Sequence, residues 1–271
     1  MRLTKHHGLG NDFLVAVQPD LPANASALAQ AVCHRTRGVG ADGLIFALRG
    51  DPSCSTDVTM VLFNADGGRA EMSGNGIRCL VQAILRQNTV PNVSNAEFRI
   101  STDVGVRVVS TQACDDPHIL HARVDMGPIG VGPAISRQHV QLNVGNQQVE
   151  AQVGTASLGN PHVVLGVSDL EQLDIAVVGP QQSVLAGGSN VEVIAPGPDS
   201  QSITMKVWER GVGVTEACGT GACAAAHIAH GWGWVADVVL VCMPGGKVVV
   251  ELGDTIILGG SVEYIASVEY G

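Results

Sequence analysis

Two short segments combine a side chain that can move a proton with a glycine-rich stretch that can open a helix. Cys218 precedes Gly219-Thr220-Gly221, and Ser73 precedes Gly74-Asn75-Gly76. The first N–H groups of a helix have no intrahelical partner and carry positive potential, and glycine lets an anion approach them closely. Each segment therefore predicts a site that binds a carboxylate without any lysine or arginine.

The thiol of Cys218 has the position expected of a reactive cysteine. A helix N-terminus lowers the pKa of a thiol and raises its thiolate fraction, so the position predicts a proton acceptor or a nucleophile. The alternative is an inert buried cysteine, which is the usual state of this residue. We expect that state for the other six, which are Cys33, Cys54, Cys79, Cys114, Cys223 and Cys242.

The two segments belong to an internal repeat. Gly10-Asn11-Asp12-Phe13 recurs as Gly159-Asn160-Pro161-His162, at an offset of 149 residues. Ser73-Gly74-Asn75-Gly76 recurs as Cys218-Gly219-Thr220-Gly221, at an offset of 145 residues. Two motifs at nearly one offset predict two similar halves. Two equivalent helix starts on opposite faces of one ligand would suit inversion of a carbon centre, in which one group removes a proton and another delivers one.

The hydrophobic pattern predicts many strands and few helices. Alternating segments separated by glycine-rich turns indicate strands, and three apolar segments indicate helices. We expect an α+β fold of two pseudo-symmetric domains, each a curled, mostly antiparallel sheet around a central helix, with the active site in the cleft between domains. The predicted helices are Ala25–Arg35, Gly76–Gln87 and Gly221–His230. The predicted strands are Thr56–Phe63, Phe98–Ser101, Val104–Val109, Leu120–Met126, His139–Val144, His162–Val167, Ile203–Trp208, Val238–Met243 and Lys247–Leu252.

Composition and charge exclude several classes of protein. The 271 residues carry a formal net charge of −10, which disfavours nucleic acid and anionic membrane surfaces as partners. Neither a signal peptide nor a membrane-spanning stretch is apparent, and the seven scattered cysteines indicate reduced thiols in the cytoplasm. The three lysines stand in no motif typical of a pyridoxal enzyme.

The glycine-rich motifs together resemble the diaminopimelate epimerase family, within a superfamily that includes proline racemase and PhzF-like proteins. The similarity runs along essentially the whole chain. It depends on Gly8–Phe13, Gly40–Gly43, Asn64–Gly67, Gly74–Arg78, Gly159–His162, Asn190–Glu192, Trp208–Gly211 and Ala217–Gly221.

The resemblance implies a chemistry and a set of site residues. The expected reaction is epimerisation of LL-diaminopimelate to meso-diaminopimelate in lysine biosynthesis, by two-base proton transfer without pyridoxal, metal or other cofactor, in a homodimer. The implied catalytic residues are Cys218, position 73, His162 and Glu209. The implied substrate-binding residues are Asn11, Asn64, Gly74, Asn75, Asn160, Asn190, Glu209, Arg210, Gly219 and Thr220. The implied halves are residues 1–122 with 264–271, and residues 123–263.

The family has a cysteine where this chain has Ser73. A hydroxyl is a much weaker acid than a thiol and a poor group for moving an α-proton. Three interpretations fit: an inactivated variant, a subgroup that uses serine, or one-sided chemistry with Cys218 alone. The alternative functions are therefore an isomerase or dehydratase of the same fold that acts with Cys218 alone, and an amino-acid-binding protein with impaired catalysis.

Two further motifs are interpreted as structural. Gly38-x-Gly40-x-x-Gly43 matches a dinucleotide fingerprint, but a strand must precede that motif and a helix must follow it. Here a helical pattern precedes it and the strand-like Leu44–Ala47 follows, so we expect a turn. The pairs His118/His121 and His227/His230 have no convincing third ligand near them in the sequence, and we expect no metal site.

Overall fold

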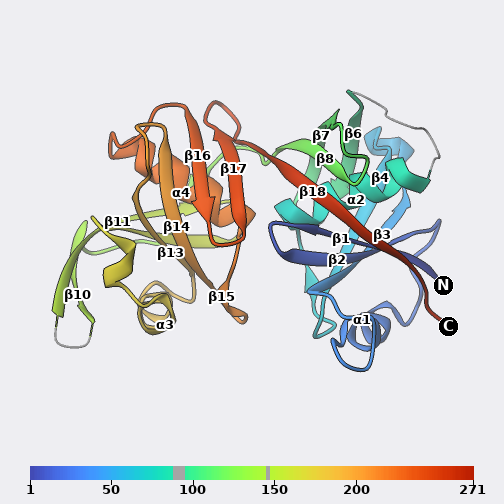
Figure 1. Ribbon diagram of the computed structural model, residues 1–271, viewed down its shortest axis with the longest axis horizontal. Helices are drawn as coiled ribbons and strands as arrows, with labels where there is room; N and C mark the ends of the chain where they lie inside the picture. Colours follow the sequence, from blue (N-terminus) through green and yellow to red (C-terminus); the bar gives the residue numbers. More distant parts are fainter. Residues whose placement is uncertain (88–94, 145–146) are drawn as a thin grey trace. The chain divides into compact units, whose positions relative to one another are not determined.

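The computed structural model describes residues 1–87, 95–144 and 147–271. The chain forms two compact units (Figure 1). Unit 1 comprises Met1–Asp125 and Gly259–Gly271, and unit 2 comprises Met126–Leu258. Among the described residues, every helix is too short or too polar to cross a membrane.

The elements are mostly strands. Unit 1 contains β1 (Arg2–Gly8), β2 (Asn11–Val17), α1 (Ala25–Cys33), β3 (Gly43–Arg49), the 3-10 helix η1 (Pro52–Cys54), β4 (Val58–Asn64), β5 (Arg69–Ala70), α2 (Gly74–Gln87), β6 (Glu97–Thr102), β7 (Gly105–Ala113) and β8 (Ile119–Asp125). Unit 2 contains β9 (Gly130–Val131), β10 (His139–Val144), β11 (Gln147–Ser157), β12 (Pro161–Gly166), the 3-10 helix η2 (Leu170–Gln172), α3 (Ile175–Leu185), β13 (Asn190–Pro196), β14 (Ser202–Glu209), β15 (Gly213–Thr215), α4 (Gly219–Gly231), β16 (Val238–Met243) and β17 (Gly246–Glu251). The last strand, β18 (Ile257–Glu269), begins in unit 2 and runs through unit 1.

The sheet of unit 1 curls until it closes. β18 pairs with β1 and β1 with β2, both antiparallel, and β2 then pairs with β3 in parallel. The order continues through β4, β6, β7 and β8, with a single further parallel pairing, β4 with β6. A pairing of β8 with β18 completes the ring.

Unit 2 repeats this topology. β12 pairs with β13 in parallel, β13 with β14 antiparallel, β14 with β16 in parallel and β16 with β17 antiparallel. In the chain, α3 connects the strands of the first parallel pair and α4 those of the second. In unit 1, α1 and α2 connect the two parallel pairs in the same way. The predicted α+β fold with two similar halves, each a mostly antiparallel curled sheet around a helix, is confirmed.

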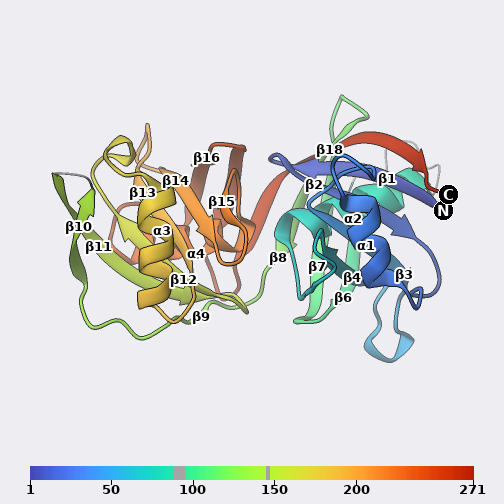
Figure 2. The ribbon, with the colours of Figure 1, turned by 90° about the horizontal axis from the view of Figure 1, so that it is seen from below.

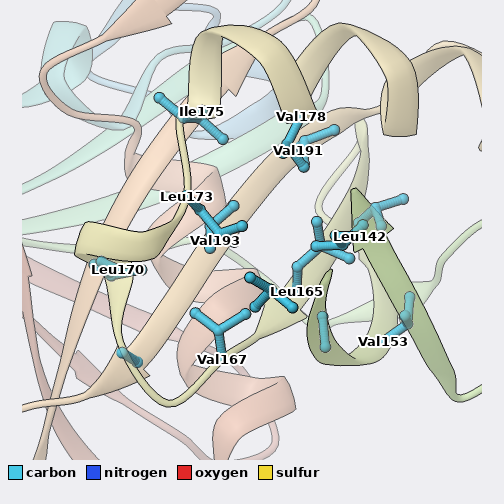
Figure 3. Close-up of a cluster of buried hydrophobic side chains, with 14 residues drawn as sticks. Leu142, Val153, Leu165, Val167, Leu170, Leu173, Ile175, Val178, Val191 and Val193 are labelled. Carbon is cyan, nitrogen blue, oxygen red and sulfur yellow. The ribbon is translucent and has the colours of Figure 1, made fainter. Parts of the chain in front are cut away.

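Helices cover the strands of each unit on both faces. In unit 1, α2 packs on β1, β2, β3 and β8, whereas α1 packs on β3 and β4. Figure 2 shows α3 of unit 2 lying along its sheet, where it contacts β13 and β14. Figure 3 shows the apolar core beneath α3, in which Leu165, Val191 and Val193 meet Ile175 and Val178. Because both faces are covered, β2, β3 and β13 are buried along most of their length.

Each predicted helix and strand has a counterpart in the structure. The strands predicted at His139–Val144 and Val238–Met243 have the bounds of β10 and β16, and the other elements have shifted ends. The helix predicted to run to Arg35 ends at Cys33, because the carbonyls of Val32 and Cys33 accept hydrogen bonds from Val39, Gly40 and Ala41. The two helices predicted from Gly76 and Gly221 begin two residues earlier, at Gly74 and Gly219. The segment Gly38–Gly40 is a turn between α1 and β3, as expected.

Several elements were absent from the prediction. They are β1, β2, β11, β13, β18 and α3, together with the short strands β5, β9 and β15 and the 3-10 helices η1 and η2. The buried strands β2 and β13 do not alternate clearly between apolar and polar residues, so their pattern lacks the period of a half-buried strand. Helix α3 contains Pro180, which usually indicates a break, yet the carboxylate of Asp174 caps it by accepting from Ala176 N.

Candidate active site

The two glycine-rich segments form equivalent helix starts. Ser73 O accepts from Ile77 N at 2.9 Å, and Ser73 Oγ accepts from Gly76 N at 3.0 Å. In unit 2, Cys218 O accepts from Ala222 N at 2.9 Å, and Cys218 Sγ accepts from Gly221 N at 3.3 Å. Ser73 and Cys218 are therefore the N-caps of α2 and α4.

The expected lowering of the Cys218 pKa is wrong. Burial raises the pKa of this thiol well above its ordinary value, and the negative charges of Glu209 and Glu192 raise it further. Hydrogen bonds from Thr220 and the Gly221 N–H oppose these effects without overcoming them. A helix start acts on a thiol through its positive potential, and here two carboxylates offset that potential. Burial and these carboxylates therefore favour the thiol form of Cys218 over the thiolate.

The other cysteines are not uniformly buried. Cys33, Cys79 and Cys223 are buried as expected, and burial raises the pKa of Cys33 and of Cys79 to about 12. The expectation of burial is wrong for three others, because Cys54 is exposed and Cys114 and Cys242 are half-buried.

Glu209 lies close to Cys218. Its carboxylate accepts a hydrogen bond of 2.5 Å from Thr215 Oγ1. Burial raises the pKa of Glu209, although the hydrogen bonds from Thr215 and Cys218 act in the opposite direction. The raised pKa makes this carboxylate a better proton acceptor for the neighbouring thiol than an exposed carboxylate would be.

A chain of hydrogen bonds connects His162 to Cys218. His162 Nε2 lies 3.1 Å from Asn160 Oδ1, and Asn160 Nδ2 donates to Thr220 Oγ1 at 3.3 Å. Thr220 Oγ1 in turn lies 3.5 Å from Cys218 Sγ. On its other side, His162 Nδ1 lies 2.8 Å from Glu192 Oε1. Unit 2 thus brings together four of the expected site residues, Asn160, His162, Cys218 and Thr220, and adds Glu192.

Unit 1 brings the amide of Asn11 to its own helix start. Asn75 Nδ2 donates to Asn11 Oδ1 at 3.3 Å, and Arg78 donates to Asn75 Oδ1. Asn11 Nδ2 donates to Asp42 Oδ2 at 2.8 Å. Asp42 therefore determines which way the Asn11 amide faces, a role that the sequence analysis missed although it quoted the motif containing Asp42.

An ion-pair network supports this corner. Asp12 pairs with Lys5 Nζ at 2.9 Å and with Arg35 at 2.8 Å, and Arg35 also pairs with Asp42 at 2.6 Å. Burial tends to raise the pKa of Asp12, but the hydrogen bonds from Arg35 and Lys5 outweigh it and hold that pKa below its ordinary value. The network fixes the strand start that carries Asn11.

The remaining predicted residues lie at strand ends. Asn190, at the start of β13, is buried, and its Oδ1 accepts from Arg210 N at 2.9 Å. The Arg210 guanidinium is exposed and donates to Gly188 O at 3.0 Å. Asn64 ends β4 opposite Gly43, and its side chain is exposed.

The strand registers show how the two units differ at their helix starts. Phe13 pairs with Gly43 in unit 1 as His162 pairs with Asn190 in unit 2, so Ile45 occupies the place of Glu192. The surroundings of the helix-start glycines support this equivalence. A Cβ on Gly76 would lie 3.1 Å from Ile45 Cδ1, and a Cβ on Gly221 would lie 2.5 Å from Glu192 Oε1. The apolar pair Phe13/Ile45 thus stands where unit 2 has a carboxylate and an imidazole.

Several known proteins with similar sequences are diaminopimelate epimerases. The family model for diaminopimelate epimerase matches residues 3–131 and 154–262. The diaminopimelate epimerase of Desulfitobacterium hafniense is 37% identical, over 94% of this chain and 92% of that protein. The diaminopimelate epimerase of Pelotomaculum thermopropionicum is 34% identical, over 100% of this chain and 99% of that protein.

Solved structures with the same fold are more distant in sequence. A PhzF-family phenazine biosynthesis protein from Bacillus anthracis superposes with a TM-score of 0.75 at 14% identity, over 100% of this chain and 98% of that one. A probable proline racemase from Agrobacterium radiobacter superposes with a TM-score of 0.73 at 16% identity, over 100% and 92%. With family model and relatives in agreement along nearly the whole sequence, the chain belongs to the diaminopimelate epimerase family and is an isomerase.

Proposed function

We propose that Cys218 moves the α-proton in the epimerisation of LL-diaminopimelate to meso-diaminopimelate. The observation that carries this proposal is the position of Cys218 as N-cap of α4, with Sγ accepting from Gly221 N. A carboxylate bound at the N–H groups of Gly219 and Thr220 would have its α-carbon beside that sulfur. The same N–H groups would stabilise the negative charge that develops on the carboxylate when the α-proton leaves, without a cofactor.

Glu209 completes the proton transfer in this proposal. Cys218 starts as a thiol, because burial and nearby carboxylates raise its pKa. It can therefore donate a proton to a carbanion directly. To act as a base it must first pass its proton to Glu209, whose raised pKa makes that carboxylate a suitable acceptor. His162 supports the pair through Asn160 and Thr220.

The remaining polar residues hold the substrate. Asparagine amides suit an ammonium and a carboxylate together, because each has one acceptor and two donors. We assign the distal amino-acid end of the substrate to Asn11, Asn64, Asn160 and Asn190, with Glu209 and Arg210. Gly74 and Asn75, at the start of α2 in the first half of the repeat, would also bind the reacting carboxylate.

Ser73 makes the two faces of the reaction unequal. In this proposal the half made of residues 1–122 and 264–271 supplies Ser73, and the half made of residues 123–263 supplies Cys218. The two side chains act on opposite faces of the α-carbon. Ser73 has neither an acidic thiol nor a carboxylate–imidazole pair beneath it, because Phe13 and Ile45 take those places. We therefore expect proton exchange at the Cys218 face to be faster than inversion. This asymmetry supports the second candidate function, an isomerase or dehydratase of the same fold that acts with Cys218 alone.

The proposed setting is a homodimer in the cytoplasm. The seven cysteines are all free thiols, which fits a reducing compartment. Val184 and Leu185, at the end of α3, are 79% and 78% exposed, and an apolar pair of this kind suits a symmetric contact with a second copy. Sedimentation of the wild type and of the variant Val184→Lys/Leu185→Lys tests this, since the double variant should sediment as a monomer.

Exchange with solvent deuterium tests the proposed reaction. The protein is incubated in D₂O with LL- or meso-diaminopimelate, and α-deuteration and inversion are followed by NMR and chiral chromatography. Inversion supports the epimerase, whereas exchange without inversion supports one-sided action. Binding with neither process supports an amino-acid-binding protein and contradicts the proposal.

A further inference from the structure

We propose that Glu192 is a positioning residue that holds His162 for its part in proton transfer at Cys218. The inference rests on the proposed function. Glu192 Oε1 and His162 Nδ1 are 2.8 Å apart, and both side chains are fully buried. Among the residues that the structure describes, no hydrogen-bond partner meets Oε2 of Glu192. A buried carboxylate with one oxygen unpartnered is unfavourable for folding, so its presence calls for a functional reason.

The fold itself does not need this carboxylate. Unit 1 has the same strands and the same helix start, and it places Ile45 and Phe13 where unit 2 has Glu192 and His162. Ile45 is fully buried against Gly76, as Glu192 is buried against Gly221. The chain thus contains its own apolar version of the pair, and that version accompanies Ser73 rather than Cys218.

The contacts of His162 define what Glu192 does. The carboxylate accepts the Nδ1 proton, which fixes the ring in one orientation. Nε2 then faces Asn160 Oδ1 at 3.1 Å, and Asn160 continues to Thr220 beside the thiol. Both ring nitrogens therefore face an oxygen, and Glu192 places a carboxylate beside the ring.

Three variants separate positioning from folding. Glu192→Gln keeps the shape and an acceptor oxygen but removes the charge. Glu192→Ile and His162→Phe/Glu192→Ile transplant the side chains of unit 1. Glu171→Gln is the control, since Glu171 is 86% exposed in the same unit. Each protein is labelled with ¹⁵N-histidine, and the ring N–H protons, thermal unfolding and α-deuteration of diaminopimelate are measured.

The wild type should show a downfield Nδ1–H proton of His162 that exchanges slowly with water and is absent from His162→Phe/Glu192→Ile. In Glu192→Gln this proton should move upfield and exchange faster. Where the wild type is active, α-deuteration should fall roughly tenfold or more with little change in KM. The double variant should unfold at or above the wild-type temperature, and Glu171→Gln should resemble the wild type throughout.

Other outcomes would overturn the inference. An unchanged His162 proton in Glu192→Gln would show that the carboxylate does not position the ring, and a double variant that unfolds far below the wild type would show a structural role. The NMR measurement needs no turnover. A wild-type protein without activity would therefore contradict the proposed function alone.

Discussion

Substitution of Gly221 by alanine should break the contact between Glu192 and His162 without touching either residue. A Cβ at position 221 would lie 2.5 Å from Glu192 Oε1, 3.1 Å from Glu192 Cδ and 3.2 Å from Cys218 Sγ. Real Cβ atoms essentially never approach another heavy atom within 3.0 Å. Glu192 has little room to move, because it is fully buried and bonded to His162 at 2.8 Å.

The magnitude follows from the geometry. To reach the 3.4 Å of an ordinary contact, the carboxylate oxygen must move by ~0.9 Å from its 2.5 Å position. A shift of that size away from the helix removes the hydrogen bond to His162, which contributes about 1.5–3 kcal/mol when one partner is charged. Alanine in place of glycine stabilises a helix by about 1 kcal/mol. The net effect should be a loss of about 0.5–2 kcal/mol in the free energy of unfolding.

The assay combines urea unfolding with α-deuteration of diaminopimelate in D₂O. Misplacing a catalytic group by about 1 Å can cost on the order of 100-fold in rate, so we expect exchange in Gly221→Ala to fall by at least roughly tenfold. Gly231→Ala in the same helix is the control, because a Cβ there meets nothing within 4 Å. It should raise stability and leave exchange unchanged. If Gly221→Ala is as stable and as active as Gly231→Ala, the close approach of Glu192 to this helix start has no functional meaning.

Three further predictions concern other parts of the site. Ser73→Cys should raise the ratio of inversion to α-deuteration by roughly tenfold or more, since a thiol is the stronger acid; an unchanged ratio argues against a role for position 73. Burial raises the pKa of Glu209 above its ordinary 4.5, so the wild type loses stability as pH rises from below 4.5 through the raised pKa. Glu209→Gln should therefore match the wild type in urea unfolding at pH 4 and be more stable at pH 7, and equal stability at both pH values would refute the assigned cause. Asp42→Ala removes the acceptor of the Asn11 amide, so it should raise KM by about tenfold with a smaller change in kcat, and an unaltered KM would exclude Asp42 from orienting Asn11.

The local features of the site are visible in the sequence because they are local. Glycines next to Ser73 and Cys218 precede apolar runs, and that pattern alone predicts two helix starts after these residues. The repeat then predicts that the two starts are equivalent, and the matching strand registers confirm it. The same reasoning identifies Asn160 and His162, since both lie in a repeated motif.

The electrostatics of Cys218 depend on its burial and on carboxylates that neighbouring strands bring to it. Its raised pKa follows from burial and from Glu209 and Glu192, which β14 and β13 bring to the start of α4. The motif around position 218 contains the helix start, and the resemblance adds Glu209, but neither gives the burial of the thiol or the carboxylate of Glu192. Asp42 was missed for the same reason, because its contact with Asn11 spans 31 residues.

Loss of the Cys218 thiol tests the account most directly. The α-proton of LL- or meso-diaminopimelate should exchange with D₂O in the presence of the wild type. Exchange should fall to the background rate with Cys218→Ala, while binding of the substrate persists in calorimetry. Exchange that continues in Cys218→Ala would show that another group moves the proton, and would contradict the assignment of the reaction to the start of α4.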